Sequence, residues 1–274
     1  ITYRYALQHS RNVAAVKVAD EVGMTKVIKL AKEMGISTLT DQDYNLSTAL
    51  GGLTHGVTPL EMVQAYGVLA NGGIKVQPTA ILKIVDRNGQ VVEEHSIQEK
   101  RVVDEKDAAI ITNMLESVIN GGTGGNAAIG RPAAGKTGTT DDSKDAWFVG
   151  YTPDLVAAVW IGDDYGSETL RGITGGDTPA IMWGQFMANA LANTPASDFS
   201  VPASAQSAVS EGYYNPVKAQ PKKEAAKDEK ADKKDDKDKS KDEAVKDDSG
   251  SSKDDASEQK SNSSKSKKSS KKDR

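Results

Sequence analysis

The sequence predicts a fold of the α/β class, of the α+β type, in which helices pack against a small antiparallel sheet. Apolar residues recur at helical spacing through much of the first 120 residues. Three short strand patterns between residues 133 and 161 are separated by only a few residues. Strands connected so closely must be antiparallel, because parallel neighbours need a long crossover. Residues 218–274 are almost only Lys, Asp, Glu, Ser and Ala, which cannot bury enough apolar surface to fold.

Four helices are expected before residue 120. Gly23 and Gly35 end the first two, as glycine does at many helix C-termini. The third begins at Thr58, with Pro59 in its first turn and Glu61 completing a capping box. Residues 40–55 are expected to form a loop before it. The helices are expected over residues 3–21, from Val27 to Met34, over 58–70 and over 104–119, the last capped by Asp104.

A hairpin and a three-stranded sheet are expected after the third helix. Asn88-Gly89 is a strong hairpin turn signal between strand patterns at residues 80–86 and 90–94. Four glycines around Thr123 then break the chain. The sheet strands are expected over residues 133–139, 146–151 and 155–161, and Asp177 is expected to start the last helix.

Charge separates two parts of the chain. Residues 1–217 carry 16 Lys and Arg against 24 Asp and Glu, whereas residues 218–274 carry 19 against 15. The acidic first part argues against nucleic-acid binding as the main activity. We expect a folded domain over residues 1–200, a linker over 201–217 and a disordered tail over 218–274. The tail is interpreted as a solvated tether, with weak adhesion to an anionic polymer as the alternative.

Several kinds of site and segment are excluded by what the sequence lacks. It contains no cysteine, which excludes disulfides, thiolate catalysis and cysteine-based metal sites. His9, His55 and His95 lack ligand spacing, so no metal is expected. No apolar run approaches the ~20 residues of a membrane span. No signal peptide is present, and Ile1 falls just ahead of a helical pattern, so we expect the N-terminus to be a truncation.

The segment from Gly130 to Thr137 fits the phosphate-loop pattern G-x-x-x-x-G-K-[ST]. That motif needs a strand before it and a helix that begins at its lysine, here Lys136. A glycine-rich loop precedes the segment instead. Gly138, two threonines and two aspartates follow it and do not favour a helix. Nucleotide binding is therefore a disfavoured interpretation.

A second interpretation places residues 136–139 on an edge strand that lines a cleft. Alternation then puts Thr137 and Thr139 on one face, and Lys136 and Gly138 on the other. Threonine hydroxyls and a lysine charge suit a carboxylate, and an exposed strand edge offers amide donors to a substrate or an oxyanion. On these residues alone, an ordinary polar hairpin strand is an equal alternative.

Lys136-Thr137-Gly138 resembles one of the three signatures of the penicillin-binding protein and serine β-lactamase superfamily. Ser10-Arg11-Asn12 resembles the S-x-N signature of class A penicillin-binding proteins. The resemblance extends in family order over residues 3–190 and implies the transpeptidase fold of that family, truncated at its N-terminus. The other segments that carry it are Gly56 to Met62, Asp145 to Tyr151, Trp160 to Gly162 and Gly175 to Asp177.

The resemblance implies a peptidoglycan D,D-transpeptidase, in which a serine is acylated by a stem peptide ending in D-Ala-D-Ala. It implies no cofactor. Ser10 is then expected to relay a proton, Asn12 to hydrogen-bond the motif lysine and the substrate amide, and Lys136 to orient Ser10. Thr137, Gly138 and Thr139 would bind the substrate: the two hydroxyls would hold its carboxylate, and the N–H of Thr139 would donate to the oxyanion.

The nucleophile of this family belongs to an S-x-x-K motif, expected upstream of Ser10 and absent from this chain. Matches to S-x-x-K occur only in the Ser- and Lys-rich tail, where chance explains them. We expect a fragment that is inactive alone, from a protein with a membrane anchor and a glycosyltransferase domain. It would act at the extracytoplasmic face of the bacterial membrane on stem peptides and bind β-lactams; for the tail, contact with anionic wall polymers is the alternative to a solvated tether. A non-catalytic binding fragment is the alternative function.

Overall fold

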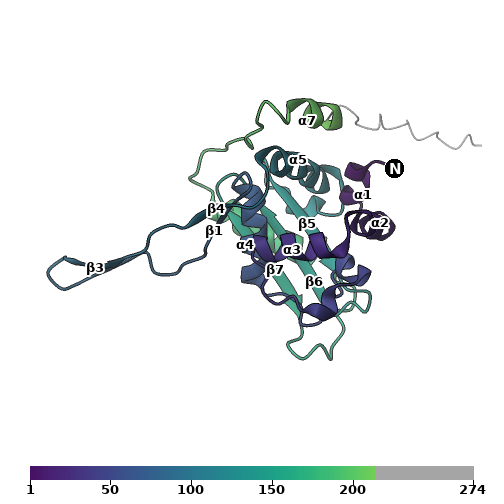
Figure 1. The fold of residues 1–274 in the computed structure, drawn as a ribbon, viewed down its shortest axis with the longest axis horizontal. Helices are drawn as coiled ribbons and strands as arrows, with labels where there is room; N and C mark the ends of the chain where they lie inside the picture. The colour runs from purple at the N-terminus through teal and green to yellow at the C-terminus, as the bar shows by residue number, and fades with distance from the viewer. Residues whose placement is uncertain (214–274) are drawn as a thin grey trace, which may run out of the picture. The chain divides into compact units, whose positions relative to one another are not determined.

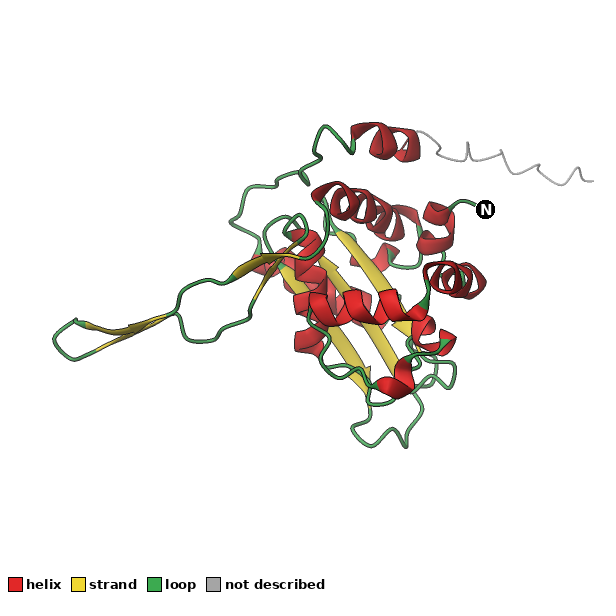
Figure 2. Cartoon of the chain, viewed as in Figure 1, coloured by secondary structure: helices red, strands yellow, loops and turns green. Residues whose placement is uncertain are grey.

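The computed structural model describes residues 1–213, so the tail predicted over 218–274 lies outside the described residues. Within them, helices cover both faces of a central sheet (Figures 1 and 2). The α-helices are α1 (Tyr3–Gln8), α2 (Asn12–Val22), α3 (Met24–Met34), α4 (Pro59–Ala70), α5 (Glu105–Gly121), α6 (Thr178–Ala190) and α7 (Gln206–Tyr213). No helix in this part of the chain has the length and apolar character needed to cross a membrane.

The central sheet has the order β5-β6-β7 with both pairs antiparallel, as predicted. Tyr151 packs toward α4 and α5, whereas Phe148 packs against Trp183 of α6 on the opposite face, with ring centroids 5.2 Å apart. Side chains alternate along a strand, so Thr137 lies on the α6 face and Lys136 on the α5 face. The three strands are β5 (Ala134–Thr139), β6 (Asp145–Tyr151) and β7 (Val156–Gly162).

The single helix predicted over residues 3–21 is wrong, because the chain forms two helices there. Ser10 has a φ of 50°, a left-handed conformation that a continuing helix does not allow. The N–H of Ser10 bonds to the carbonyl of Leu7, and the N–H of Arg11 bonds to that of Ala6, which closes α1. The break leaves Ser10 at the corner between α1 and α2.

The other predicted helices are confirmed. Thr58 and Glu61 form the predicted capping box of α4, and Asp104 caps α5. The predicted loop over residues 40–55 contains two short 3-10 helices, η1 (Asp41–Asp43) and η2 (Leu46–Leu50). A third, η3 (Gly125–Ala127), follows α5. Helix α7 forms in the predicted linker.

The predicted hairpin is confirmed in β2 (Lys83–Val85) and β3 (Val91–Glu94), which extend away from the sheet (Figure 1). The sequence did not predict the strands at its base, β1 (Ile74–Val76) and β4 (Glu99–Arg101), which pair with each other. All the residues of β2 and β3 are exposed.

Two buried carboxylates hold the loop between α3 and α4. Glu61 accepts hydrogen bonds from the backbone and hydroxyl of both Ser37 and Thr58, at 2.7 to 3.0 Å. Burial acts to raise the pKa of Glu61, but these hydrogen bonds outweigh it and lower the pKa to about 2. Asp43 accepts equivalent bonds from Thr40 and Thr54, which hold its pKa far below the ordinary value. The loop is therefore fixed by charge-assisted hydrogen bonds rather than by apolar packing alone.

Candidate active site

The corner at Ser10 is held against α5. Arg4 of α1 donates from Nη1 to the carbonyl of Asn113 at 2.8 Å and from Nη2 to Oδ1 of the same residue at 2.7 Å. At the other end of α1, the carbonyl of Gln8 accepts a hydrogen bond from the N–H of Thr123 at 3.2 Å. Both ends of this short helix are thus tied to α5 or to the turn that follows it, and the position of Ser10 is fixed relative to the sheet.

Lys136 reaches from β5 to this corner. Its Nζ donates to Ser10 Oγ at 2.8 Å and to the carbonyl of Thr137 at 3.0 Å. Burial lowers the pKa of Lys136 to about 8, because partial removal from water disfavours the charged amine. Neither of the two ion pairs found among the described residues involves Lys136. Lys136 therefore donates a hydrogen bond to a serine hydroxyl, and no described carboxylate balances its charge in an ion pair.

The threonines of β5 lie on the other face of the strand, as the alternation predicted. Thr137 Oγ1 lies 2.7 Å from Thr123 Oγ1, and Thr139 Oγ1 accepts a hydrogen bond from the N–H of Gly175 at 3.0 Å. The backbone of Gly175 lies directly against Gly138, and any side chain there would collide with it. This close approach brings the loop before α6 over the end of β5.

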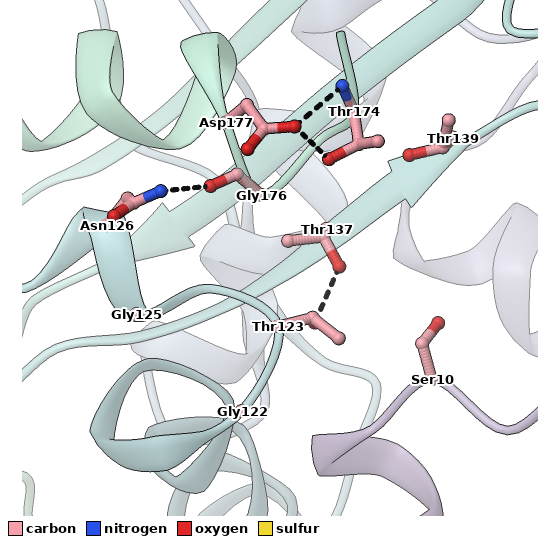
Figure 3. Close-up of a pocket in the computed structure, with 10 residues that line it drawn as sticks. All are labelled: Ser10, Gly122, Thr123, Gly125, Asn126, Thr137, Thr139, Thr174, Gly176 and Asp177. Atoms are coloured by element: carbon pink, nitrogen blue, oxygen red, sulfur yellow. Dashed lines mark hydrogen bonds between the residues drawn. The ribbon is translucent and has the colours of Figure 1, made fainter. Parts of the chain in front are cut away.

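Side chains from four segments line a cavity of about 510 Å³ (Figure 3). Asp177 is the one charged residue among the described residues that line it, and its carboxylate accepts hydrogen bonds from the N–H and the hydroxyl of Thr174. Asn126 Nδ2 donates to the carbonyl of Gly176 at 2.8 Å. The lining residues are Ser10, Gly122, Thr123, Gly125, Asn126, Thr137, Thr139, Thr174, Gly176 and Asp177. The cavity is therefore rich in hydroxyl groups and suits a polar ligand.

Asn12 does not join this cavity. It is the first residue of α2, is exposed, and makes no side-chain hydrogen bond to any described residue. It lines a second cavity, of about 540 Å³, whose other lining residues include Ser10, Arg11, Val13 and Lys17. Ser10 therefore lies between the two cavities, with Lys136 beside it.

The structure also decides between the two interpretations of the lysine motif. Lys136 lies inside strand β5 and no helix begins there, so the phosphate-loop interpretation lacks the helix N-terminus that it requires. The sequence did not assign Thr123, Asn126, Thr174 or Asp177 to the site. Each of these residues is next to a glycine in the sequence. Glycines indicate a turn or a close approach, but they do not specify which segments of the chain meet.

The fold and the site together define an α+β protein with a lysine–serine pair at the edge strand of an antiparallel sheet. A family model described as the penicillin binding protein transpeptidase domain matches residues 1–171. The chain belongs to this family, as a transpeptidase domain of the class A penicillin-binding proteins.

Individual relatives agree with this assignment. The chain is 39% identical over 203 residues to penicillin-binding protein 1A of Aquifex aeolicus, covering 74% of this chain and 27% of that protein. The structure matches penicillin-binding protein 1A of Haemophilus influenzae with a TM-score of 0.68 at 26% identity, covering 74% of this chain and 36% of that one. It matches the PonA1 protein of Mycobacterium tuberculosis in complex with penicillin V with a TM-score of 0.65 at 30% identity, covering 73% and 58%. The chain thus spans about a quarter of the length of its curated relatives.

Proposed function

We propose that this chain supplies one wall of a peptidoglycan D,D-transpeptidase site, with the nucleophile carried by an S-x-x-K segment upstream. The observation that carries the proposal is the 2.8 Å hydrogen bond from Lys136 Nζ to Ser10 Oγ. Because the lysine donates, the Ser10 hydroxyl keeps its own proton to give to another group. A serine in this state suits a proton relay to a departing amine.

The proposed reaction proceeds in two steps. The upstream serine attacks the carbonyl between the two D-alanines, its proton passes through the base of its own motif and Ser10 to the leaving nitrogen, and D-Ala departs. An amine of a second stem peptide then attacks the acyl-serine, loses its proton by the reverse route and releases the serine. Asn12, exposed beside Ser10, would hydrogen-bond the lysine of the upstream motif and the substrate amide.

Strand β5 would hold the substrate. The hydroxyls of Thr137 and Thr139 line the cavity of about 510 Å³ and would bind the terminal carboxylate, with the Lys136 ammonium adding positive potential. Gly138 lies between them on the same strand, and the N–H of Thr139 would donate to the oxyanion. β-Lactams, which carry a carboxylate beside a reactive amide, would occupy the same position.

The wider setting of this domain is part of the same proposal. Its relatives are cell-wall enzymes of which the matched segment makes up about a quarter, which supports an upstream glycosyltransferase domain and membrane anchor and a site at the extracytoplasmic face of the bacterial membrane. Adhesion of the charged tail to anionic wall polymers is a separate proposal, supported only by its composition.

Covalent labelling by a fluorescent penicillin tests the proposed function. The polypeptide from the complete gene, which includes the upstream segment, is expected to become labelled, and residues 1–274 expressed alone are not. Labelling of the short chain would place the nucleophile within it and contradict the proposal. Absence of labelling in the complete polypeptide, when it binds penicillin reversibly, would favour a non-catalytic binding protein.

A further inference from the structure

The hydroxyls of Thr123 and Thr137 lie 2.7 Å apart, and both residues line the cavity of about 510 Å³ (Figure 3). Thr123 belongs to the glycine-rich turn after α5, whereas Thr137 belongs to β5, so the bond joins two separate walls of the site. Thr123 is not part of either sequence signature identified above.

The position of Thr123 is fixed by the backbone on two sides. Its N–H donates to the carbonyl of Gln8, two residues before Ser10. The preceding Gly122 packs so closely on that carbonyl that a side chain at Gly122 would collide with it. On the other side, a side chain at Gly176 would collide with the carbonyl of Thr123. A residue held from both sides is able to set the direction of a neighbouring hydroxyl.

A hydroxyl has one proton, so a threonine of β5 offers it to a ligand only when it acts as the acceptor, and not the donor, in its hydrogen bond with the protein. Thr139 meets this requirement, because its Oγ1 accepts from the N–H of Gly175 at 3.0 Å. Within residues 1–213 no backbone N–H donates to Thr137 Oγ1; its partners are the Thr123 hydroxyl at 2.7 Å and the Lys136 amine, which donates from 3.5 Å.

We infer that Thr123 is a positioning residue for carboxylate binding: it donates to Thr137 and thereby directs the proton of Thr137 into the cavity. The inference rests on the proposed function, since it takes the ligand group at Thr137 to be a carboxylate. In this arrangement both β5 hydroxyls receive a hydrogen bond from a fixed donor and offer their own protons to the two oxygens of the ligand. Hydroxyls aligned before binding lose less conformational freedom when the ligand arrives.

The test compares acylation of the complete polypeptide by benzylpenicillin and by its methyl ester, which has no free carboxylate. Thr123→Val keeps the shape of the side chain but has no proton to donate. The second-order acylation constant for benzylpenicillin is expected to fall about tenfold, as for loss of one hydrogen bond to a charged group, whereas the constant for the ester is expected to change less than about twofold. Thr123→Ser restores the donor and should recover most of the loss. Thr25→Val, an exposed substitution in α3, serves as the matched control.

Each outcome separates this inference from the proposed function. If the wild-type polypeptide is not acylated by either compound, the proposed function fails. If it is acylated and Thr123→Val behaves like the wild type, the positioning role is wrong while the proposed function stands. Equal losses for acid and ester would assign Thr123 a structural role and also overturn the inference. Thr123→Ala, measured in the same way, replaces the valine variant if the latter does not fold.

Discussion

Lys136 and Ser10 are 126 positions apart in the sequence, and the Nζ of the first donates to the Oγ of the second at 2.8 Å. The bond joins the edge strand of the sheet to the corner between the first two helices. Every role proposed for the site depends on this contact, because it fixes the serine hydroxyl beside the strand that would hold the substrate.

Removal of the lysine is expected to reduce acylation strongly. Lys136→Met in the complete polypeptide should lower the second-order rate constant with benzylpenicillin on the order of 10²–10³-fold, because a preorganised positive donor is lost. Lys29→Met, at a lysine whose side chain is 75% exposed on α3, is the matched control and should leave the rate unchanged. A Lys136→Met rate within threefold of the wild type would show that the lysine does not act in the reaction.

The pKa of Lys136, lowered by burial to about 8, predicts a pH dependence. The ammonium is the form that donates to Ser10 and attracts a carboxylate, so the second-order acylation constant should fall as pH rises through about 8. This constant reports groups of the free enzyme. In Lys136→Arg the guanidinium stays charged, so the acylation constant that remains should not fall as pH rises through about 8. A wild-type profile that is flat between pH 7 and 9.5 would contradict the assignment.

Glu61 is expected to contribute stability that depends on pH. Its pKa is lowered to about 2 in the folded chain, so the carboxylate stabilises the fold above the ordinary value of 4.5 and loses this effect as pH falls toward 2. Glu61→Gln should cost about 1–3 kcal/mol at pH 7, because buried donors lose their acceptor. The temperature at which half the penicillin-labelling capacity is lost should be lower in this variant than in the wild type. The difference between the two temperatures should shrink as pH is lowered from 5 to 3. Glu21→Gln, at an exposed position of α2, is the control, and equal temperatures for both variants at pH 7 would refute the prediction.

Much of the fold was predictable, because local signals agreed with one another. The turn at Asn88-Gly89 and the capping box at Thr58 and Glu61 act over a few residues, and the structure confirms both. The break at Ser10 was not predictable, since apolar residues continue at helical spacing across it and only the packing of two helices requires the left-handed turn. Strands β1 and β4 have only three residues each, and β4 contains no apolar residue, so the sequence pattern was too short to predict their pairing.

The same distinction between local signals and tertiary contacts applies to the site. Resemblance to family motifs indicated Ser10 and the residues of β5, and strand alternation indicated which side chains share a face. Thr123, Asn126 and Asp177 lie in turns whose glycines fit many conformations, so their meeting with β5 required the tertiary structure.

The close contact between Gly175 and β5 predicts a sensitive position. In Gly175→Ala the new methyl group would meet the backbone of Gly138 and Trp147, so the loop before α6 must move away from the strand. Acylation by benzylpenicillin is expected to fall about 10²-fold, as misplacement of site groups by about 1 Å can cause. Gly67→Ala is the matched control, because a methyl group at this helical position of α4 meets no atom of the other described residues within 4 Å, apart from the neighbouring backbone of its own helix. Similar rates for the two variants would show that the loop does not shape the site.

The central claim is that Lys136 and Ser10 face a nucleophilic serine supplied from upstream, and mapping of the penicillin adduct tests it most directly. The complete polypeptide is treated with benzylpenicillin, digested, and the modified peptide identified by mass spectrometry, for the wild type and for Lys136→Met. We expect the adduct on the serine of an upstream S-x-x-K segment, with its rate of formation strongly reduced in the variant. An adduct on any residue of this chain, or an upstream adduct formed equally fast in both proteins, would contradict the account.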